Sequence, residues 1–263
     1  MIKSEINRVF KNKSFYAVLL VGITITTLEA FSNNNIRLST VDFIDFPNGV
    51  YNNLILYNLG EYMRMLQMVF PLIVTVAFAD SYLEDVKSGF IKNIITRYDK
   101  KKYLITRFLV NFVVSGVVIS IPLIVNYMLY AGSIPSIDPH IYFSQVNVDA
   151  YGFLPGLYYT YPFIHMCIRI LLLFIYGGAL SSIALATSIF IKSKYIITII
   201  PFIVYIGIDV IIPMMLQSGY KYSPMIFLFN PTGYNFMFAT IPIILITGCF
   251  SIFFIGGMKN EFV

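Results

Sequence analysis

The chain has 263 residues, of which 58% are hydrophobic and 12% are charged, and its mean hydropathy is +0.77. A soluble domain ordinarily carries about twice this fraction of charged residues, and so apolar a surface would aggregate in water, so the composition excludes an ordinary soluble protein. The net charge of +5 requires no nucleic-acid partner, because membrane proteins concentrate Lys and Arg in their cytoplasmic loops.

Residues 1–13 are not apolar enough to enter a bilayer, and their periodicity predicts an amphipathic helix. Apolar side chains share one face and cations occupy the rest, with Ile2, Ile6, Val9 and Phe10 on the first and Lys3, Arg8 and Lys11 on the second. Such a helix lies in the headgroup plane of a lipid bilayer, its cations toward anionic lipid. The alternative is a frayed basic tail that only orients the first span.

Six apolar runs are long enough to cross the roughly 30 Å of hydrocarbon in a bilayer. They cover approximately residues 15–31, 62–79, 103–131, 161–191, 195–216 and 236–258. If the N-terminus is inside, fourteen of the eighteen Lys and Arg fall in cytoplasmic segments, as the positive-inside rule requires. The sequence therefore predicts an all-α polytopic membrane protein with six spans, both termini cytoplasmic, and one membrane domain covering residues 1–263.

Residues 80–102, between the second and third spans, concentrate charge in an otherwise apolar chain. Val86, Phe90 and Ile94 recur at helical spacing, which predicts a helix with one apolar face, and Gly89 is expected to let another backbone approach closely. Positive-inside sorting explains the cations but not the acids beside them. We therefore interpret this segment as a docking surface, rather than an ordinary charged loop, formed by Glu84, Asp85, Lys87, Gly89, Phe90, Lys92 and Arg97.

The outer loops, residues 132–160 and 217–235, are rich in Asn, Pro, Gly and Tyr. The second of them contains the apolar stretch Pro224–Phe229, which is too short to span a bilayer. Pro favours the first turn of a helix and cannot continue one. We therefore predict a short helix that re-enters the outer leaflet, begun by Pro224 and ended before Pro231.

Four charges lie within or at the edges of the predicted spans, at Glu29, Arg64, Arg169 and Asp209. A charge at the centre of a membrane helix costs about 2.5–3.5 kcal/mol, so such residues need partners. One hypothesis pairs Arg169 with Asp209, or both with Glu29 and Arg64, in the interior of the bundle, where they line or gate an outer vestibule of a pathway. The alternative is a structural ion pair, or side chains that reach the outer interface.

Catalytic motifs are absent from the sequence. No Lys follows a Gly anywhere, so the phosphate-binding loop of ATPases is missing. The two His residues have no neighbouring carboxylates at metal-ligand spacing. We therefore expect that the chain is not an enzyme, and that it binds neither a metal nor a cofactor.

Taken together, these features resemble the membrane subunit of type-2 ABC exporters (ABC-2-type permeases). That family has an amphipathic elbow helix before six spans, a charged stretch between spans two and three, and a short re-entrant helix before the last span. Within the charged stretch, an acid, a Gly, an Arg and a Lys match in order at Glu84, Gly89, Arg97 and Lys102. The sequence departs from the family after Arg97, where Tyr-Asp-Lys-Lys-Lys replaces the usual small residue or Pro.

The resemblance implies a permease in a cell membrane, specifically a bacterial plasma membrane, that pairs with a second, identical or related permease and with two ATP-binding subunits. ATP and Mg would be bound by those partners, and residues 80–102 would couple them to the spans. The elbow helix, with Ile6, Arg8, Phe10 and Lys11, would pack beside this segment, and Glu84 or Asp85 would form a salt bridge with Arg8 or Lys11.

The cargo implied by the resemblance is an amphipathic peptide, such as a bacteriocin, or a lipophilic compound. The alternative function is an autonomous ion channel or proton-coupled carrier that uses Glu29, Arg169 and Asp209 as a relay. Carriers of that kind usually show broken helices in two repeated halves, and no repeat is visible in the sequence.

Overall fold

The structure is a computed structural model that describes residues 2–37, 49–58, 60–96, 98–140, 148, 152–215, 223–229 and 237–259. Every regular element within these residues is a helix. Six of them are long and apolar enough to cross a membrane. Five of them are α2 (Lys13–Arg37), α7 (Lys100–Ser133), α9 (Pro162–Thr187), α10 (Lys194–Met215) and α12 (Met237–Lys259). The remaining span, Glu61–Lys87, consists of α4 (Glu61–Val76) and the short helix α5 (Ser81–Lys87) that follows it. The prediction of an all-α polytopic membrane protein with six spans is therefore confirmed.

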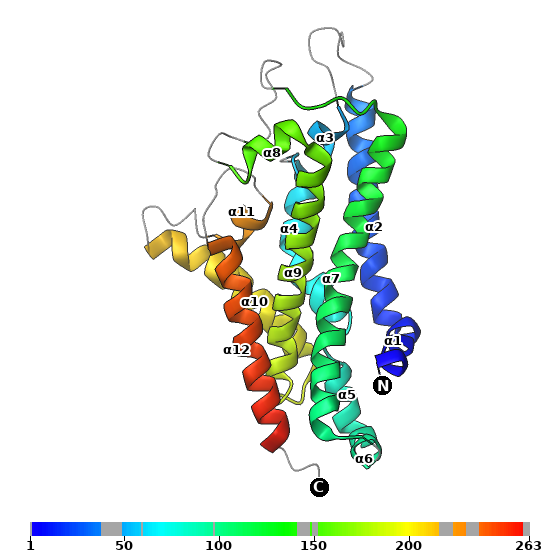
Figure 1. Ribbon diagram of the computed structural model, residues 1–263, viewed down its shortest axis with the longest axis vertical. Helices are drawn as coiled ribbons and strands as arrows, with labels where there is room; N and C mark the ends of the chain where they lie inside the picture. The colour runs from blue at the N-terminus through cyan, green and yellow to red at the C-terminus, as the bar shows by residue number, and fades with distance from the viewer. Residues whose placement is uncertain are drawn as a thin grey trace.

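Six short helices flank the long ones at the two ends of the bundle (Figure 1). At the end of the bundle where α12 finishes lie α1 (Ile2–Lys11), α5 (Ser81–Lys87) and α6 (Phe90–Ile95). Toward the other end lie α3 (Val50–Asn53), α8 (Pro155–Thr160) and α11 (Pro224–Phe229). The predicted short helices at 1–13 and 224–229 are thus present. Much of the outer loops, including 217–222 and 230–235, lies outside the described residues.

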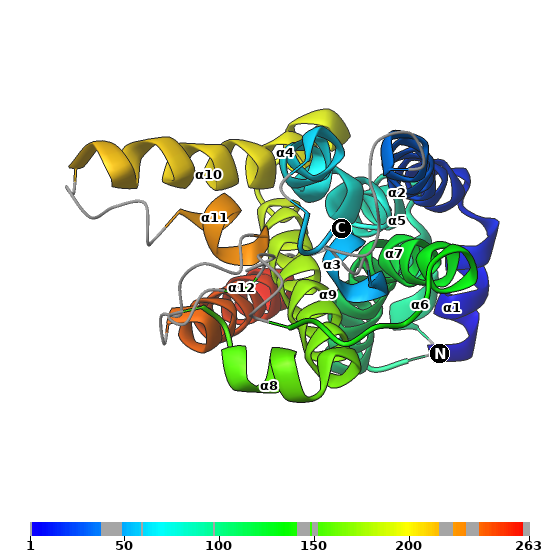
Figure 2. The ribbon, with the colours of Figure 1, turned by 90° about the horizontal axis from the view of Figure 1, so that it is seen from above.

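The core of the bundle is built by α4, α7 and α9, whose side chains are mostly buried, while α2, α10 and α12 pack around them and stay largely exposed. Figure 2 shows α9 near the middle and α10 projecting away from the other helices. Apolar side chains exposed on the outer helices suit a hydrocarbon environment. Ile203 and Met214 on α10 are 61% and 84% exposed.

The contact between α7 and α9 depends on two glycines that each receive an aromatic ring from the opposite helix. A Cβ atom at Gly116 of α7 would lie 2.5–2.6 Å from the ring of Phe174 on α9. A Cβ atom at Gly178 of α9 would likewise collide with the ring of Phe112 on α7. The two rings meet edge to face, with centroids 6.0 Å apart. Small residues of this kind let membrane helices pack closely.

The segment at residues 80–102 is not one helix, so that part of the prediction is wrong. Gly89 has φ +69° and separates α5 from α6, because the left-handed conformation ends a helix and is accessible to glycine at little cost. Within the described residues, a Cβ at Gly89 would meet nothing within 4 Å, so the close approach expected at Gly89 stays a prediction about a partner. The break turns Phe90 outward, 46% exposed, and buries Ile91.

Candidate functional site

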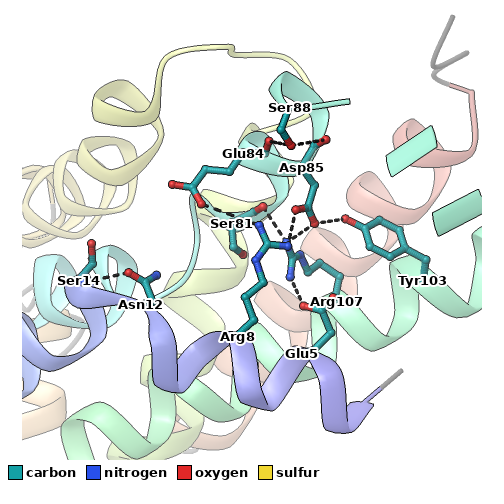
Figure 3. A network of polar contacts seen from close by, with 10 residues as sticks. All are labelled: Glu5, Arg8, Asn12, Ser14, Ser81, Glu84, Asp85, Ser88, Tyr103 and Arg107. Atoms are coloured by element: carbon teal, nitrogen blue, oxygen red, sulfur yellow. Dashed lines mark hydrogen bonds and ion pairs between the residues drawn. The ribbon is translucent and has the colours of Figure 1, made fainter. Parts of the chain in front are cut away.

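A network of charged side chains joins α1, α5 and α7 at the end of the bundle where α12 finishes (Figure 3). Its centre is Asp85 on α5, which is fully buried. One carboxylate oxygen of Asp85 pairs with Arg8 of α1. The other oxygen accepts hydrogen bonds from Arg107 and from the Tyr103 hydroxyl, the latter at 2.7 Å. Asp85 is thus held from two neighbouring helices at once.

Arg107 closes the network from α7 and is also fully buried. Its Nη1 atom donates to the carboxylate of Glu5 on α1, and its Nη2 atom donates to Asp85 and to the carbonyl oxygen of Ser81, 2.7 Å away. The guanidinium carbon lies 5.2 Å from the centroid of the Phe78 ring. Arg107 therefore binds α1 and α5 to α7 through three acceptors.

Helical spacing brings these residues onto facing surfaces. Side chains three or four residues apart lie on the same side of a helix. Glu5 and Arg8 on α1 are three apart, while Tyr103 and Arg107 on α7 are four apart, as are Ser81 and Asp85 on α5. Each helix thus contributes one pair of residues to the network, with Ser81 taking part through its backbone carbonyl oxygen.

Helix caps fix the approach of these elements. Asp99 precedes α7 and accepts a hydrogen bond from the backbone N–H of Lys101 at 3.2 Å, which satisfies one of the donors left free at a helix start. Asn12, between α1 and α2, accepts from the backbone N–H of Ser14 at 2.9 Å. The turn at Asn12 lets α1 lie against the bundle instead of continuing α2.

Charge is balanced within the buried part of the network, where two arginines face the two carboxylates of Glu5 and Asp85. Burial lowers the pKa of Arg8, but the attraction of Asp85, followed by that of Glu5, outweighs it and raises the pKa above its ordinary value. Buried ion pairs add little net stability compared with apolar packing, yet removing one partner is costly. The network thus specifies one arrangement of α1, α5 and α7.

The ion pair expected between the N-terminal helix and the acids of residues 80–102 is present. Arg8 pairs with Asp85 and also lies 3.9 Å from the carboxylate of Glu84. Lys11, the other expected cation, does not take part in the ion pairs recorded for the described residues. Ile6 and Phe10 of α1 are 43% and 57% exposed, on the side turned away from the network.

Of the predicted docking residues, Asp85 is the one that the structure contradicts. It has no exposed surface and is surrounded by Arg8, Arg107 and Tyr103, so it cannot contact a partner protein directly. The side chains of Glu84, Lys87, Phe90 and Lys92 are exposed. Arg97 lies outside the described residues.

Sequence reasoning missed four members of the network, which are Glu5, Ser81, Tyr103 and Arg107. A signal existed for Arg107, because it lies inside the third predicted span, and a charge in that position requires a partner. Glu5 is the one acid among the cations of residues 1–13, which could also have drawn attention. Ser81 contributes only its backbone carbonyl oxygen, and a side-chain pattern gives no signal for that.

At the opposite end of the bundle, Glu29 is buried among neutral donors. Its carboxylate accepts hydrogen bonds from Asn126 of α7 at 2.8 Å, from the Tyr130 hydroxyl at 3.0 Å, from Asn58 at 3.3 Å and from Asn33. These contacts tie α2 to α7 and to the segment after α3. The hypothesis that Glu29 pairs with a cation of another span is therefore wrong for the described residues.

Arg169 and Asp209 do not pair with each other among the ion pairs of the described chain, which contradicts the hypothesis from sequence. Arg169 is buried on α9 and donates to the carbonyl oxygen of Leu228 at 3.3 Å. Asp209 on α10 accepts from the Ser223 hydroxyl and from the backbone N–H of Met225 at 3.2 Å. Both residues thus bind α11, at opposite ends. The remaining charge, Arg64, is exposed on α4 and is not part of this group.

Comparison of the chain with protein-family models, with curated proteins and with solved structures found no match. Within the described residues, no group of three or more His, Cys, Asp or Glu side chains is placed to hold a metal ion. The functional argument therefore depends on the charged network, the surface next to it, and the arrangement of the helices.

Proposed function

We propose that the chain is the permease subunit of an ATP-driven exporter in a bacterial plasma membrane, with both termini in the cytoplasm. Two such subunits, identical or related, would form the translocation pathway and bind two separate ATP-binding subunits. The observation that carries the proposal is the projection formed by α5 and α6, which the buried network fixes to α1 and α7 (Figure 3).

The exposed side chains of this projection suit a protein partner. Phe90 is 46% exposed and Tyr98 is 51% exposed, and the exposed Lys87 and Lys92 lie on either side of Phe90 in the sequence. Aromatic anchors in a polar surround are typical of protein interfaces. Because the chain lacks a phosphate-binding loop, energy from ATP would have to enter through such a contact.

The network explains how a force on this projection would reach the spans. Asp85 lies on α5 and is bound by Arg107 of α7, so a displacement of α5 and α6 has to move α7 or break a buried ion pair, which costs about 3–5 kcal/mol. Glu5 and Arg8 connect α1 to the same point. In this proposal Asp85 transmits the movement, while Glu84, Lys87, Phe90 and Lys92 make the contact.

The alternative, an autonomous channel or carrier, has less support. It requires a relay of charges through the spans, whereas Glu29 is surrounded by amides and a tyrosine, and Arg169 and Asp209 bind opposite ends of α11. The cargo that we propose, an amphipathic peptide or lipophilic compound, rests on the resemblance described above.

Co-purification with an ATP-binding protein tests the proposal. The tagged chain should retain a soluble ATPase from its host, and ATP hydrolysis should rise when the two are reconstituted together. Phe90→Ala with Lys92→Glu should abolish this capture, whereas Lys259→Glu, an exposed cation at the same end of the bundle, should leave it intact. Equal capture by both variants would show that α6 is not the docking surface, and transport by the chain alone would contradict the exporter proposal.

A further inference from the structure

Helix α11 is held at both of its ends by charged side chains from two different spans. At its start, the Asp209 carboxylate accepts a hydrogen bond from the backbone N–H of Met225 at 3.2 Å. It accepts a second hydrogen bond from the hydroxyl of Ser223, the residue just before the helix. Near its end, Arg169 donates to the carbonyl oxygen of Leu228 at 3.3 Å. The first N–H groups and last C=O groups of a helix have no partner within it, so each charge satisfies a group that the helix leaves open.

These contacts link three elements in a line from α10 through α11 to α9. Leu228 is 4% exposed and belongs to the main apolar core of the bundle, and α11 also packs against α4. Arg169 lies 5.9 Å from the centroid of the Tyr57 ring, and the Tyr57 hydroxyl lies 2.6 Å from Nδ1 of His165 on α9. The α9 end of the line is therefore firmly anchored.

The α10 end of the line is different. From its start to Tyr205, α10 packs on the bundle, and Ile197 and Tyr205 are 0% and 2% exposed. Its second half departs from the bundle (Figure 2), and Ile211 and Met214 are 55% and 84% exposed. Among the hydrogen bonds recorded for the described residues, those of Asp209 are the ones that tie this second half to another element.

We propose that Asp209, α11 and Arg169 form a strut that sets the distance between the second half of α10 and α9. Breaking the Asp209 contact would let this half of α10 move away from the bundle. Pro213 lies within this half and Pro201 within the first, and proline weakens the hydrogen bonding that would keep a helix straight. Resting on the function proposed above, the strut would act as the outer gate of the pathway.

The distance between spin labels on α10 and α9 tests the strut directly. Labels would be attached at Met214→Cys and Ile164→Cys, both exposed positions, after the native Cys167 and Cys249 are replaced, and the protein would be reconstituted into liposomes. We expect one narrow distance distribution. When a hydrogen bond to the Asp209 carboxylate is lost, the population of molecules with a longer distance between the two labels should rise by roughly tenfold or more.

Three variants separate the strut from a general loss of charge. Asp209→Asn keeps the shape of the side chain, and Ser223→Ala removes only the donated hydroxyl; both should add a longer-distance component. Arg64→Gln, an exposed cation on α4, should leave the distribution unchanged. The proposal is overturned if the distributions of Asp209→Asn and Ser223→Ala both coincide with that of the unsubstituted protein.

This measurement needs neither ATP nor cargo, so its outcome is independent of the proposed exporter function. The gating role is tested separately, by adding the co-purified ATPase and ATP to the labelled, otherwise unsubstituted protein. A longer-distance component should then appear. If ATP is hydrolysed and the distribution does not change, the gating role is wrong, although the exporter function still stands.

Discussion

Replacing Arg107 with alanine removes the side chain that connects all three helices of the buried network. Its guanidinium donates to the Glu5 and Asp85 carboxylates and to the Ser81 carbonyl oxygen. Asp85 would keep Arg8 and Tyr103, but Glu5 would lose its ion-pair partner inside the protein. Removing one partner of a buried ion pair costs about 3–5 kcal/mol, so we expect a loss of this size.

The free energy of unfolding can be measured for the purified protein in mixed micelles, by circular dichroism during titration with SDS. Arg64→Ala is the matched control, because Arg64 is exposed and such changes stay within about 0.5 kcal/mol. The double variant Arg107→Ala, Glu5→Ala should lose less free energy of unfolding than the sum of the losses of the two single variants. The difference, which is the coupling between the two residues, should be about 0.5–3 kcal/mol. A loss for Arg107→Ala no greater than that of the control, or strict additivity with Glu5→Ala, would refute the reasoning.

The same unfolding assay tests changes at three further positions. Gly89→Ala should cost about 1–2 kcal/mol because alanine resists the left-handed φ of +69°, and Gly89→Asn should cost less because Asn tolerates that conformation. Asp99→Ala should cost about 1 kcal/mol, since it removes the acceptor of the Lys101 N–H at the start of α7. Gly178→Ala should cost about 1–3 kcal/mol, because its Cβ would collide with the Phe112 ring.

Each of these changes has an outcome that would contradict its explanation. Equal stabilities of Gly89→Ala and Gly89→Asn would mean that backbone conformation does not limit residue 89. If Asp99→Ala is as stable as the unsubstituted protein, the hydrogen bond between Asp99 and the Lys101 N–H does not stabilise the start of α7. If Phe112→Ala fails to relieve the cost of Gly178→Ala, the cost does not come from the ring.

The spans could be predicted from sequence because a bilayer requires long apolar runs, and the six expected runs overlap the six long helices. The break at Gly89 within residues 80–102 could not be predicted in the same way. Val86, Phe90 and Ile94 have helical spacing, but Gly89 takes a left-handed conformation that starts a second helix. Periodicity describes side-chain spacing and carries no information on where the backbone turns.

The charged residues were identified more reliably than their partners. Sequence reasoning anticipated that Arg8 would pair with an acid of residues 80–102, and it does. It also paired Arg169 with Asp209, whereas each binds a backbone group of α11. Backbone N–H and C=O groups are present at every position, so a sequence does not show which of them will be free to bind a charge. Asp85 shows a related limit, because nothing in its sequence context distinguishes a buried acid from an exposed one.

The reciprocal packing of Phe174 on Gly116 and of Phe112 on Gly178 has a mechanical consequence. A ring that fills a notch in one direction only could slip along the groove, but two rings that fill notches in opposite directions block sliding of α7 and α9 both ways. These two helices then move as a single body. In the proposed exporter, opening and closing would therefore turn the more exposed helices, α10 above all, about this pair. Arg107 on α7 and Arg169 on α9 would attach the projection at one end and the proposed strut at the other to the same frame.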